Sequence, residues 1–190
     1  MTAGIHFVPS IRGLFPGPDE HEVLIDLLLR RAHAPSYYAE YRCGNGRTFF
    51  TVLQALAPGS RAWALDDWDG PRITRLGLFE FSVNMQYRPK EVQVHVARLH
   101  DRFDDKFFDF VFLHALQYAR TPSHSDNISD NISGARLFVR ELSCWIKLKP
   151  GGIMMGEPAR NKQFAKQLAG FAQKHSLAVQ EKNDLWWIEK

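Results

Sequence analysis

SYYAEYRCGNGRTFFTVLQALA, residues 36–57, contains the local pattern that decides the fold. The aromatic-rich segment 36–42 has the composition of a β-strand, and the glycines of Cys43-Gly44-Asn45-Gly46 form a turn. Residues 47–57 have helical composition and stop at Pro58-Gly59. The predicted order is strand, glycine turn and helix, which is the repeating unit of a parallel α/β sheet.

The same alternation continues to the end of the chain. Residues 107–113 (FFDFVFL) are apolar except for Asp109, as in a strand buried on both faces of a parallel sheet. The sequence predicts further strands at 61–65, 92–97 and 153–156, helices at 21–33, 73–85, 135–147 and 162–175, and a hairpin of segments 177–182 and 185–189. We therefore expect an α/β fold with a mostly parallel sheet and an antiparallel pair at the end.

The composition is that of a globular protein. The chain has 190 residues, 45% hydrophobic and 24% charged, with a formal net charge of +3. This charge does not suggest nucleic acid as a partner, and a homo-oligomer is compatible with the sequence. The two cysteines lack C-x-x-C spacing, and no segment reads as a secretory signal or membrane span. We expect a cytoplasmic protein with an arm at residues 1–20 and a single domain at 21–190.

One polar segment interrupts the alternation. Residues 121–134 have no periodicity and contain a tandem Ser-Asp-Asn-Ile repeat, which predicts an insertion loop. The loop is either a lid over the strand ends or a duplication in a tolerant region.

The glycine turn and an acidic residue after the next strand favour a bound nucleoside. Glycines between a strand and a helix allow close approach of a ligand to unpaired N–H groups. Asp66 follows the second strand about 20 residues after Gly46, at a spacing where a carboxylate can accept both ribose hydroxyls. Asp67 is an alternative to Asp66, and either could instead be a turn or cap residue. Phe49 occupies the place of the third glycine of the dinucleotide fingerprint.

Five separated motifs in residues 36–157 resemble the class I S-adenosylmethionine-dependent methyltransferases, especially a small branch often found beside glycan-modifying enzymes. The motifs are EYRCGNGRT (40–48), ALDDWDG (64–70), Phe81 with Asn84-Met85, FDFVFLHALQY (108–118) and ELSCWIKLKPGGIMMGE (141–157). The resemblance implies a Rossmann-like fold with a mostly parallel seven-stranded sheet, a C-terminal antiparallel hairpin, helices on both faces and S-adenosylmethionine as cofactor.

The resemblance also implies positions for the cofactor. Glu40 and the turn Cys43-Gly44-Asn45-Gly46 would face its methionine moiety and Asp66 its ribose, while Trp68 or the loop after Ala97 would face the adenine. The neutral alternatives are an ion-paired Glu40 and a Trp68 that only packs.

Two departures from the family pattern concern the site. Arg42 stands where the first glycine of E-x-G-x-G-x-G is expected, so its side chain could block the cofactor, point outward or pair with an anionic group of the ligand. The acidic residues with which some relatives hold a metal are mostly replaced, and we expect no metal.

His114 and Glu157 remain as a candidate base and its orienting partner, with Tyr118 as a supporting residue. His114 could equally be a structural residue.

The expected function is methyl transfer from S-adenosylmethionine to an oxygen or nitrogen of a small-molecule or glycan-like acceptor. The alternative is an inactive protein of this fold that acts as a nucleoside-binding or protein-interaction module. Arg42 and the missing acids are the features that favour the alternative.

Overall fold

The computed structural model describes residues 34–66, 68, 72–99, 101–114, 143–157, 162–183 and 185–190. The predicted arm at 1–20, the predicted helix at 21–33 and the predicted loop at 121–134 lie outside these residues. The chain divides into two compact units, Met1–Arg102 and Phe103–Lys190. Because residues 1–33 are outside the described ranges, the predicted boundary between an arm at 1–20 and a single domain at 21–190 stays a prediction.

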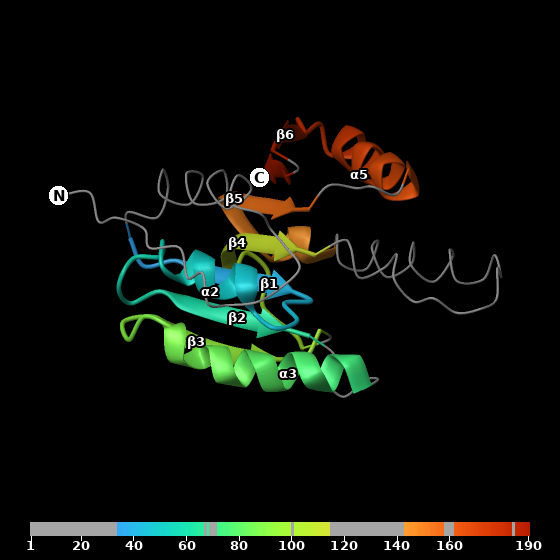
Figure 1. The fold of residues 1–190 in the computed structure, drawn as a ribbon. Coiled ribbons are helices and arrows are strands. Elements are labelled where there is room, and N and C mark those ends of the chain that lie inside the picture. The colour runs from blue at the N-terminus through green and yellow to red at the C-terminus, as the bar shows by residue number, and fades with distance from the viewer. Residues whose placement is uncertain are drawn as a thin grey trace. The chain divides into compact units, whose positions relative to one another are not determined.

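The strands form a seven-stranded mixed sheet in the order β3-β2-β1-β4-β5-β7-β6 (Figure 1). Parallel pairing joins β1 to β2, β2 to β3 and β4 to β5, whereas β7 runs antiparallel to both β5 and β6. The mostly parallel sheet and its terminal antiparallel hairpin confirm the predicted fold class.

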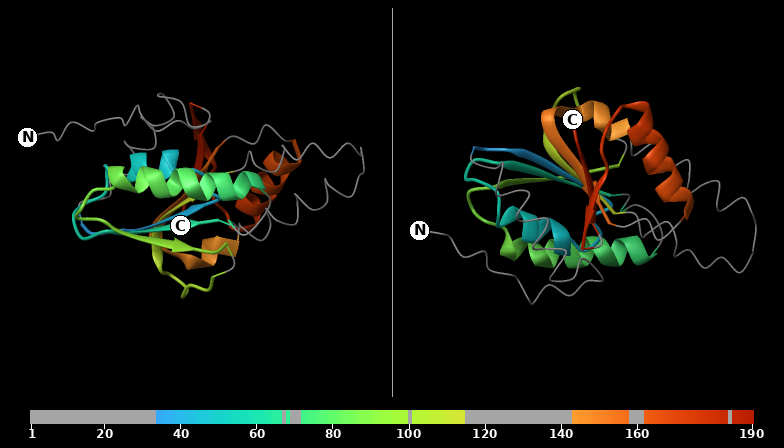
Figure 2. Two further views of the ribbon diagram at one scale, coloured as in Figure 1. Left: turned by 60° about the horizontal axis from the view of Figure 1, so that its bottom comes forward. Right: turned by 90° about the horizontal axis from the view of Figure 1, so that it is seen from above.

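In the first unit, strands β1 (Tyr37–Tyr41), β2 (Arg61–Leu65) and β3 (Gln93–Ala97) are joined through helices. Helix α2 (Arg47–Leu53) follows β1, and helix α3 (Arg72–Asn84) with the 3₁₀ helix η1 (Met85–Tyr87) follows β2. Both views of Figure 2 place α2 and α3 on the same side of these strands. The glycine turn thus lies where β1 ends and α2 begins.

Helix α2 is shorter than predicted. The pattern predicts a helix to residue 57, but α2 ends at Leu53 because the next amides bond three residues back. Ala55 N–H donates to the carbonyl of Val52 at 2.9 Å and Leu56 N–H to that of Leu53 at 3.3 Å. Such 3₁₀-type bonds tighten and end a helix.

An aromatic cluster binds α2 and α3 to the sheet. The ring of Phe81 lies 5.0 Å from that of Phe50 and 5.7 Å from that of Phe49, and all three side chains are buried. The ring of Tyr38 on β1 stacks on Phe49 at 5.9 Å. These contacts fix the first turn of α2 against β1.

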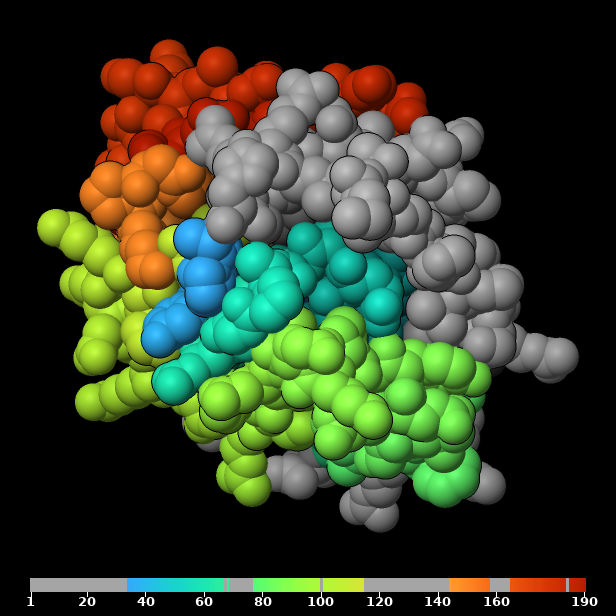
Figure 3. Space-filling view, turned by 90° about the vertical axis from the view of Figure 1, so that its left-hand side faces the viewer, coloured from blue at the N-terminus to red at the C-terminus, as the bar shows by residue number. Residues whose placement is uncertain are grey.

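The exposed segments before β2 and β3 form part of the surface drawn in teal and green in Figure 3. Gly59 N–H donates to the carbonyl of Glu91 at 2.8 Å, so the turn before β2 is tied to the segment before β3. The candidate binding residues lie at the other, carboxyl end of the strands.

In the second unit, β4 (Phe108–Leu113) is followed by η3 (Ser143–Lys147), β5 (Leu148–Gly156), α5 (Lys162–Lys174), β6 (Gln180–Lys182) and β7 (Leu185–Glu189). Strand β4 is buried as predicted, apart from the half-buried Asp109. That carboxylate is paired with the Lys149 ammonium at 2.7 Å. An acidic residue is therefore tolerated in an apolar strand.

Besides the start of β6, which is Gln180 rather than residue 177, two predicted element boundaries in this unit are wrong. The prediction begins a strand at residue 153, after a Pro150-Gly151-Gly152 turn, but β5 begins at Leu148 and contains this tripeptide. Phe108 pairs with Leu148 and Phe110 with Ile153, so the tripeptide is accommodated as a bulge, with φ 75° at Gly151.

The second boundary concerns the helix predicted at 135–147. Its described end, 143–147, is a 3₁₀ helix rather than an α-helix. The Lys190 ammonium donates to the carbonyls of Trp145 at 2.8 Å and Leu148 at 2.9 Å. These bonds satisfy carbonyls that an α-helix would direct to later amides.

Candidate cofactor and acceptor sites

The glycine turn of the first unit is built from left-handed residues. Arg42, Gly44 and Gly46 have φ angles of 61°, 53° and 81°. A Cβ at Gly46 would lie 2.6 Å from the rings of both Phe50 and Phe81, so the conformation and the packing each require glycine. The first turn of α2 therefore packs closely against α3, and the glycine turn directly precedes α2 in the chain.

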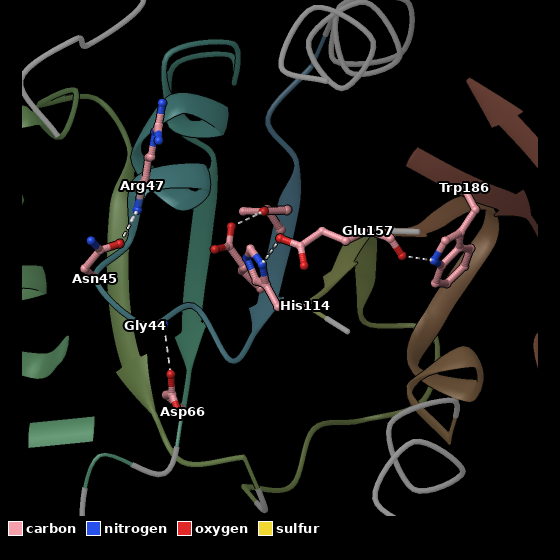
Figure 4. A network of polar contacts seen from close by, with 9 residues as sticks. Gly44, Asn45, Arg47, Asp66, His114, Glu157 and Trp186 are labelled. Carbon is pink, nitrogen blue, oxygen red and sulfur yellow. Dashed lines mark hydrogen bonds and ion pairs between the residues drawn. The ribbon is translucent and has the colours of Figure 1, made fainter. Parts of the chain in front are cut away.

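Three polar contacts hold the turn in place, and Figure 4 draws those of Asp66 with Gly44 and of Asn45 with Arg47. Gly44 N–H donates to Asp66 Oδ2 at 2.8 Å, and Arg47 N–H donates to Asn45 Oδ1 at 3.3 Å. From the end of α3, Asn84 Nδ2 donates to the Asn45 carbonyl at 2.9 Å. Asp66 thus links the end of β2 to the turn after β1, a role that the spacing alone did not reveal.

Arg42 keeps a backbone conformation suited to glycine. Its φ of 61° is left-handed, and its N–H donates to the Leu65 carbonyl at 2.7 Å. A non-glycine residue in this region costs about 1–2 kcal/mol. The departure from the family pattern thus changes the side chain but leaves a turn that glycine would also adopt.

A buried hydrogen bond lies just before the turn. Glu40 and Tyr38 are both fully buried, and the Tyr38 hydroxyl donates to Glu40 Oε2 at 2.6 Å. Burial and the neighbouring Glu40 carboxylate raise the pKa of Tyr38 well above its usual value. Burial, with the carboxylates of Glu40 and Asp66, likewise raises the pKa of the Cys43 thiol. The phenol and the thiol are therefore neutral at physiological pH.

Trp68 contributes a buried donor in the same unit. Its side chain is 8% exposed and its ring lies 5.4 Å from that of Phe81. Its Nε1 is buried and has no hydrogen-bond partner within the part of the chain that the structure describes. A buried N–H without a partner costs free energy that a ligand acceptor can recover. Asp67, the predicted alternative to Asp66, lies outside the described residues.

The glycine turn, Asp66 and Trp68 fit an adenosine-containing cofactor chemically. The turn allows close approach, the carboxylate can accept from hydroxyls, and the indole N–H can donate to an oxygen or a ring nitrogen. These residues all belong to the first unit.

The second unit brings His114 and Glu157 together. They directly follow β4 and β5, whose last residues Leu113 and Gly156 are register partners. His114 Nδ1 lies 2.8 Å from Glu157 Oε1, and the two side chains are 11% and 5% exposed (Figure 4). Adjacent parallel strands thus place an imidazole against a buried carboxylate. Tyr118, the predicted supporting residue, lies outside the described residues.

Glu157 is held by a neighbouring strand. The indole Nε1 of Trp186 on β7 donates to the Glu157 carbonyl at 2.7 Å. Glycine is needed before Glu157, since a Cβ at Gly156 would lie 2.6 Å from the Leu113 carbonyl oxygen. Glu157 Oε2 is buried and accepts no hydrogen bond from the described residues. The carboxylate thus orients the imidazole and keeps one oxygen for a further donor.

The pair defines a tautomer for His114. Because an ionised carboxylate only accepts, the contact assigns a proton to Nδ1, and the neutral form of His114 then has its lone pair on Nε2. An imidazole oriented in this way can take a proton from a hydroxyl or an amine.

Among the described residues, no group of three or more His, Cys, Asp or Glu side chains could hold a metal ion. No helix in the described ranges is long and apolar enough to cross a membrane.

Two residues that sequence reasoning missed complete these sites. Tyr38 lies two positions before Glu40 on the same strand, and this period-2 spacing could have indicated a shared face. Trp186 had no such signal, because its contact with Glu157 depends on the pairing of β5 with β7.

The fold matches that of solved methyltransferase structures. A methyltransferase from Geobacter sulfurreducens is 12% identical with a TM-score of 0.53, covering 93% of this chain and 80% of that one. An S-adenosylmethionine-dependent O-methyltransferase from Thermotoga maritima is 13% identical with a TM-score of 0.55, covering 94% and 67%. An O-methyltransferase from Bacillus cereus, in complex with S-adenosylhomocysteine, is 14% identical with a TM-score of 0.53, covering 95% and 84%.

These similarities establish the class of fold: the chain has the Rossmann-like class I methyltransferase fold. No family model and no curated protein matches the sequence. At 12–14% identity the fold alone carries over, and the roles of the site residues rest on their own geometry.

Proposed function

We propose that this protein transfers a methyl group from S-adenosylmethionine to an oxygen or nitrogen of a small-molecule or glycan-like acceptor. The observation that carries the proposal is the 2.8 Å bond from Gly44 N–H to Asp66 Oδ2, which ties the glycine turn to the carboxylate after β2. The methyltransferase fold of the solved structures supports the same reading.

The residues of the first unit would bind the cofactor. Glu40 would accept from its amino-acid ammonium group, the turn at 43–46 would face its methionine moiety, and Asp66 would accept from the ribose. Trp68 Nε1 would donate to the adenosine. When bound, S-adenosylmethionine supplies a methyl group already activated on a sulfonium.

His114 would act as the general base. Glu157 holds its Nδ1–H at 2.8 Å, so Nε2 is the atom that would take the proton of an acceptor hydroxyl or amine. Glu157 Oε2 would accept from a second donor on the same acceptor. The acceptor must also be aligned with the methyl group. Such alignment of two bound reactants can lower the activation barrier by up to about 7–11 kcal/mol.

The test combines thermal unfolding with transfer of labelled methyl groups to a panel of hydroxyl and amine acceptors. S-adenosylhomocysteine at 100 times its Kd should stabilise the fold by about 2.7 kcal/mol, with or without magnesium. His114→Ala should keep this stabilisation and lose about 10²–10⁴-fold in turnover, as expected for a general base.

The matched control for the turnover assay is His95→Ala, because His95 is an exposed imidazole that stacks on Trp63. This variant should turn over like the unmodified protein. Absence of any thermal shift with either S-adenosylmethionine or S-adenosylhomocysteine would contradict the proposed function.

A further inference from the structure

The buried pair of Tyr38 and Glu40 goes beyond what folding of β1 requires. Both residues point to the same face of one strand, and both are fully buried. A charged carboxylate in such a place is unfavourable by several kcal/mol unless it is hydrogen-bonded. A leucine at position 40 would avoid this free energy, so a buried glutamate points to a role in binding.

The hydroxyl of Tyr38 sets the orientation of that carboxylate. It donates to Glu40 Oε2 at 2.6 Å, which fixes one oxygen and thereby the direction of the carboxylate plane. The Tyr38 ring is itself held by stacking on Phe49 at 5.9 Å. Because the pKa of Tyr38 is raised, the hydroxyl remains a donor throughout the physiological range.

We propose that Tyr38 is a positioning residue that holds the Glu40 carboxylate toward the amino-acid ammonium group of the bound cofactor. This inference rests on the proposed function. Tyr38 does not touch the cofactor, and it acts through Glu40. A preoriented carboxylate gains affinity because the binding step does not have to order it.

The test separates the amino-acid part of the ligand from the adenosine part. S-adenosylhomocysteine carries the ammonium group, whereas 5′-methylthioadenosine has the same adenosine and a thioether but no amino acid. Titration calorimetry should show that Tyr38→Phe weakens S-adenosylhomocysteine about tenfold, the range expected for one hydrogen bond to a charged group. The affinity for 5′-methylthioadenosine should stay within about twofold.

Two further variants make the test specific. Tyr87→Phe removes a phenol hydroxyl from η1, outside the proposed site, and should leave both affinities unchanged. Glu40→Gln should reproduce the selective loss, since the amide keeps an acceptor for Tyr38 but loses the charge. In the double variant, Tyr38→Phe should add little to the effect of Glu40→Gln, because the two residues act as a unit.

The outcomes separate this inference from the proposed function. If the unmodified protein binds neither ligand, the proposed function fails and the inference fails with it. If the unmodified protein binds S-adenosylhomocysteine but Tyr38→Phe weakens both ligands equally, or neither, the inference alone is overturned. A selective loss in both Tyr38→Phe and Glu40→Gln supports it.

Discussion

Replacement of Gly46 by alanine tests how the binding turn is built. Gly46 has a φ of 81°, where alanine costs about 1–2 kcal/mol. The added Cβ would meet the rings of Phe50 and Phe81 at 2.6 Å each, and such overpacking costs about 1–3 kcal/mol. Gly46→Ala should therefore destabilise the protein by about 2–5 kcal/mol in total.

Gly59 provides the matched control in the same unit. Its φ is 84°, but among the described residues a Cβ there would meet only Pro35, at an ordinary 3.4 Å. Gly59→Ala should cost only the conformational part, about 1–2 kcal/mol. Urea unfolding followed by tryptophan fluorescence measures both variants. Equal losses of stability in the two variants would contradict this prediction, because the Phe50 and Phe81 contacts would then contribute nothing.

Further predictions concern helix α5, the free energy of unfolding at alkaline pH and the buried thiol of Cys43. Gly170 is exposed on α5, and no described residue lies within 4 Å of a Cβ built there. Gly170→Ala should therefore raise the free energy of unfolding by about 0.5–1 kcal/mol in the same urea assay, and a lower free energy of unfolding would contradict this prediction. The raised pKa values of Cys43 and Tyr38 mean that the unfolded chain releases these protons first, so stability should fall as pH rises above about 9, by up to about 1.4 kcal/mol per pH unit and group. Tyr38→Phe should make this fall shallower above pH 10, and an identical slope would count against it. The Cys43 thiol, 5% exposed, should resist iodoacetamide at pH 8 in the folded protein and react after denaturation, as read by mass spectrometry of the labelled peptide; rapid labelling of the folded protein would show the thiol to be accessible.

The strands were largely predictable because buried strands consist mostly of apolar residues, and this composition is visible in the sequence. Strand β2 spans Arg61–Leu65 as predicted, since RAWAL is followed directly by acidic residues. The bulge in β5 was not predictable, because Pro150-Gly151-Gly152 has the composition of a turn. Only the pairing of Phe108 with Leu148 reveals that the strand continues through it.

Some contacts between the candidate site residues could be predicted from the sequence, and others could not. The spacing from Gly46 to Asp66 indicated a carboxylate near the turn, but the bond to Gly44 N–H required the register of β1 with β2. His114 and Glu157 could be paired in advance because both follow parallel strands. The hydrogen bond from Trp186 depends on an antiparallel strand formed about 30 residues later, and local sequence carries no signal for it.

The assignment of Asp66 to the cofactor is tested most directly by calorimetric titration of S-adenosylhomocysteine into the unmodified protein, Asp66→Asn and Asp105→Asn. The Asp66→Asn change keeps an acceptor for Gly44 N–H but removes the charge. Asp105 is the control, because it is exposed, belongs to the second unit and pairs through its Oδ1 with the Lys147 ammonium at 2.7 Å. We expect micromolar binding by the unmodified protein and by Asp105→Asn, and an affinity about tenfold weaker or more for Asp66→Asn. Equal affinities in all three proteins, or no binding by any of them, would contradict the assignment of Asp66 to the cofactor.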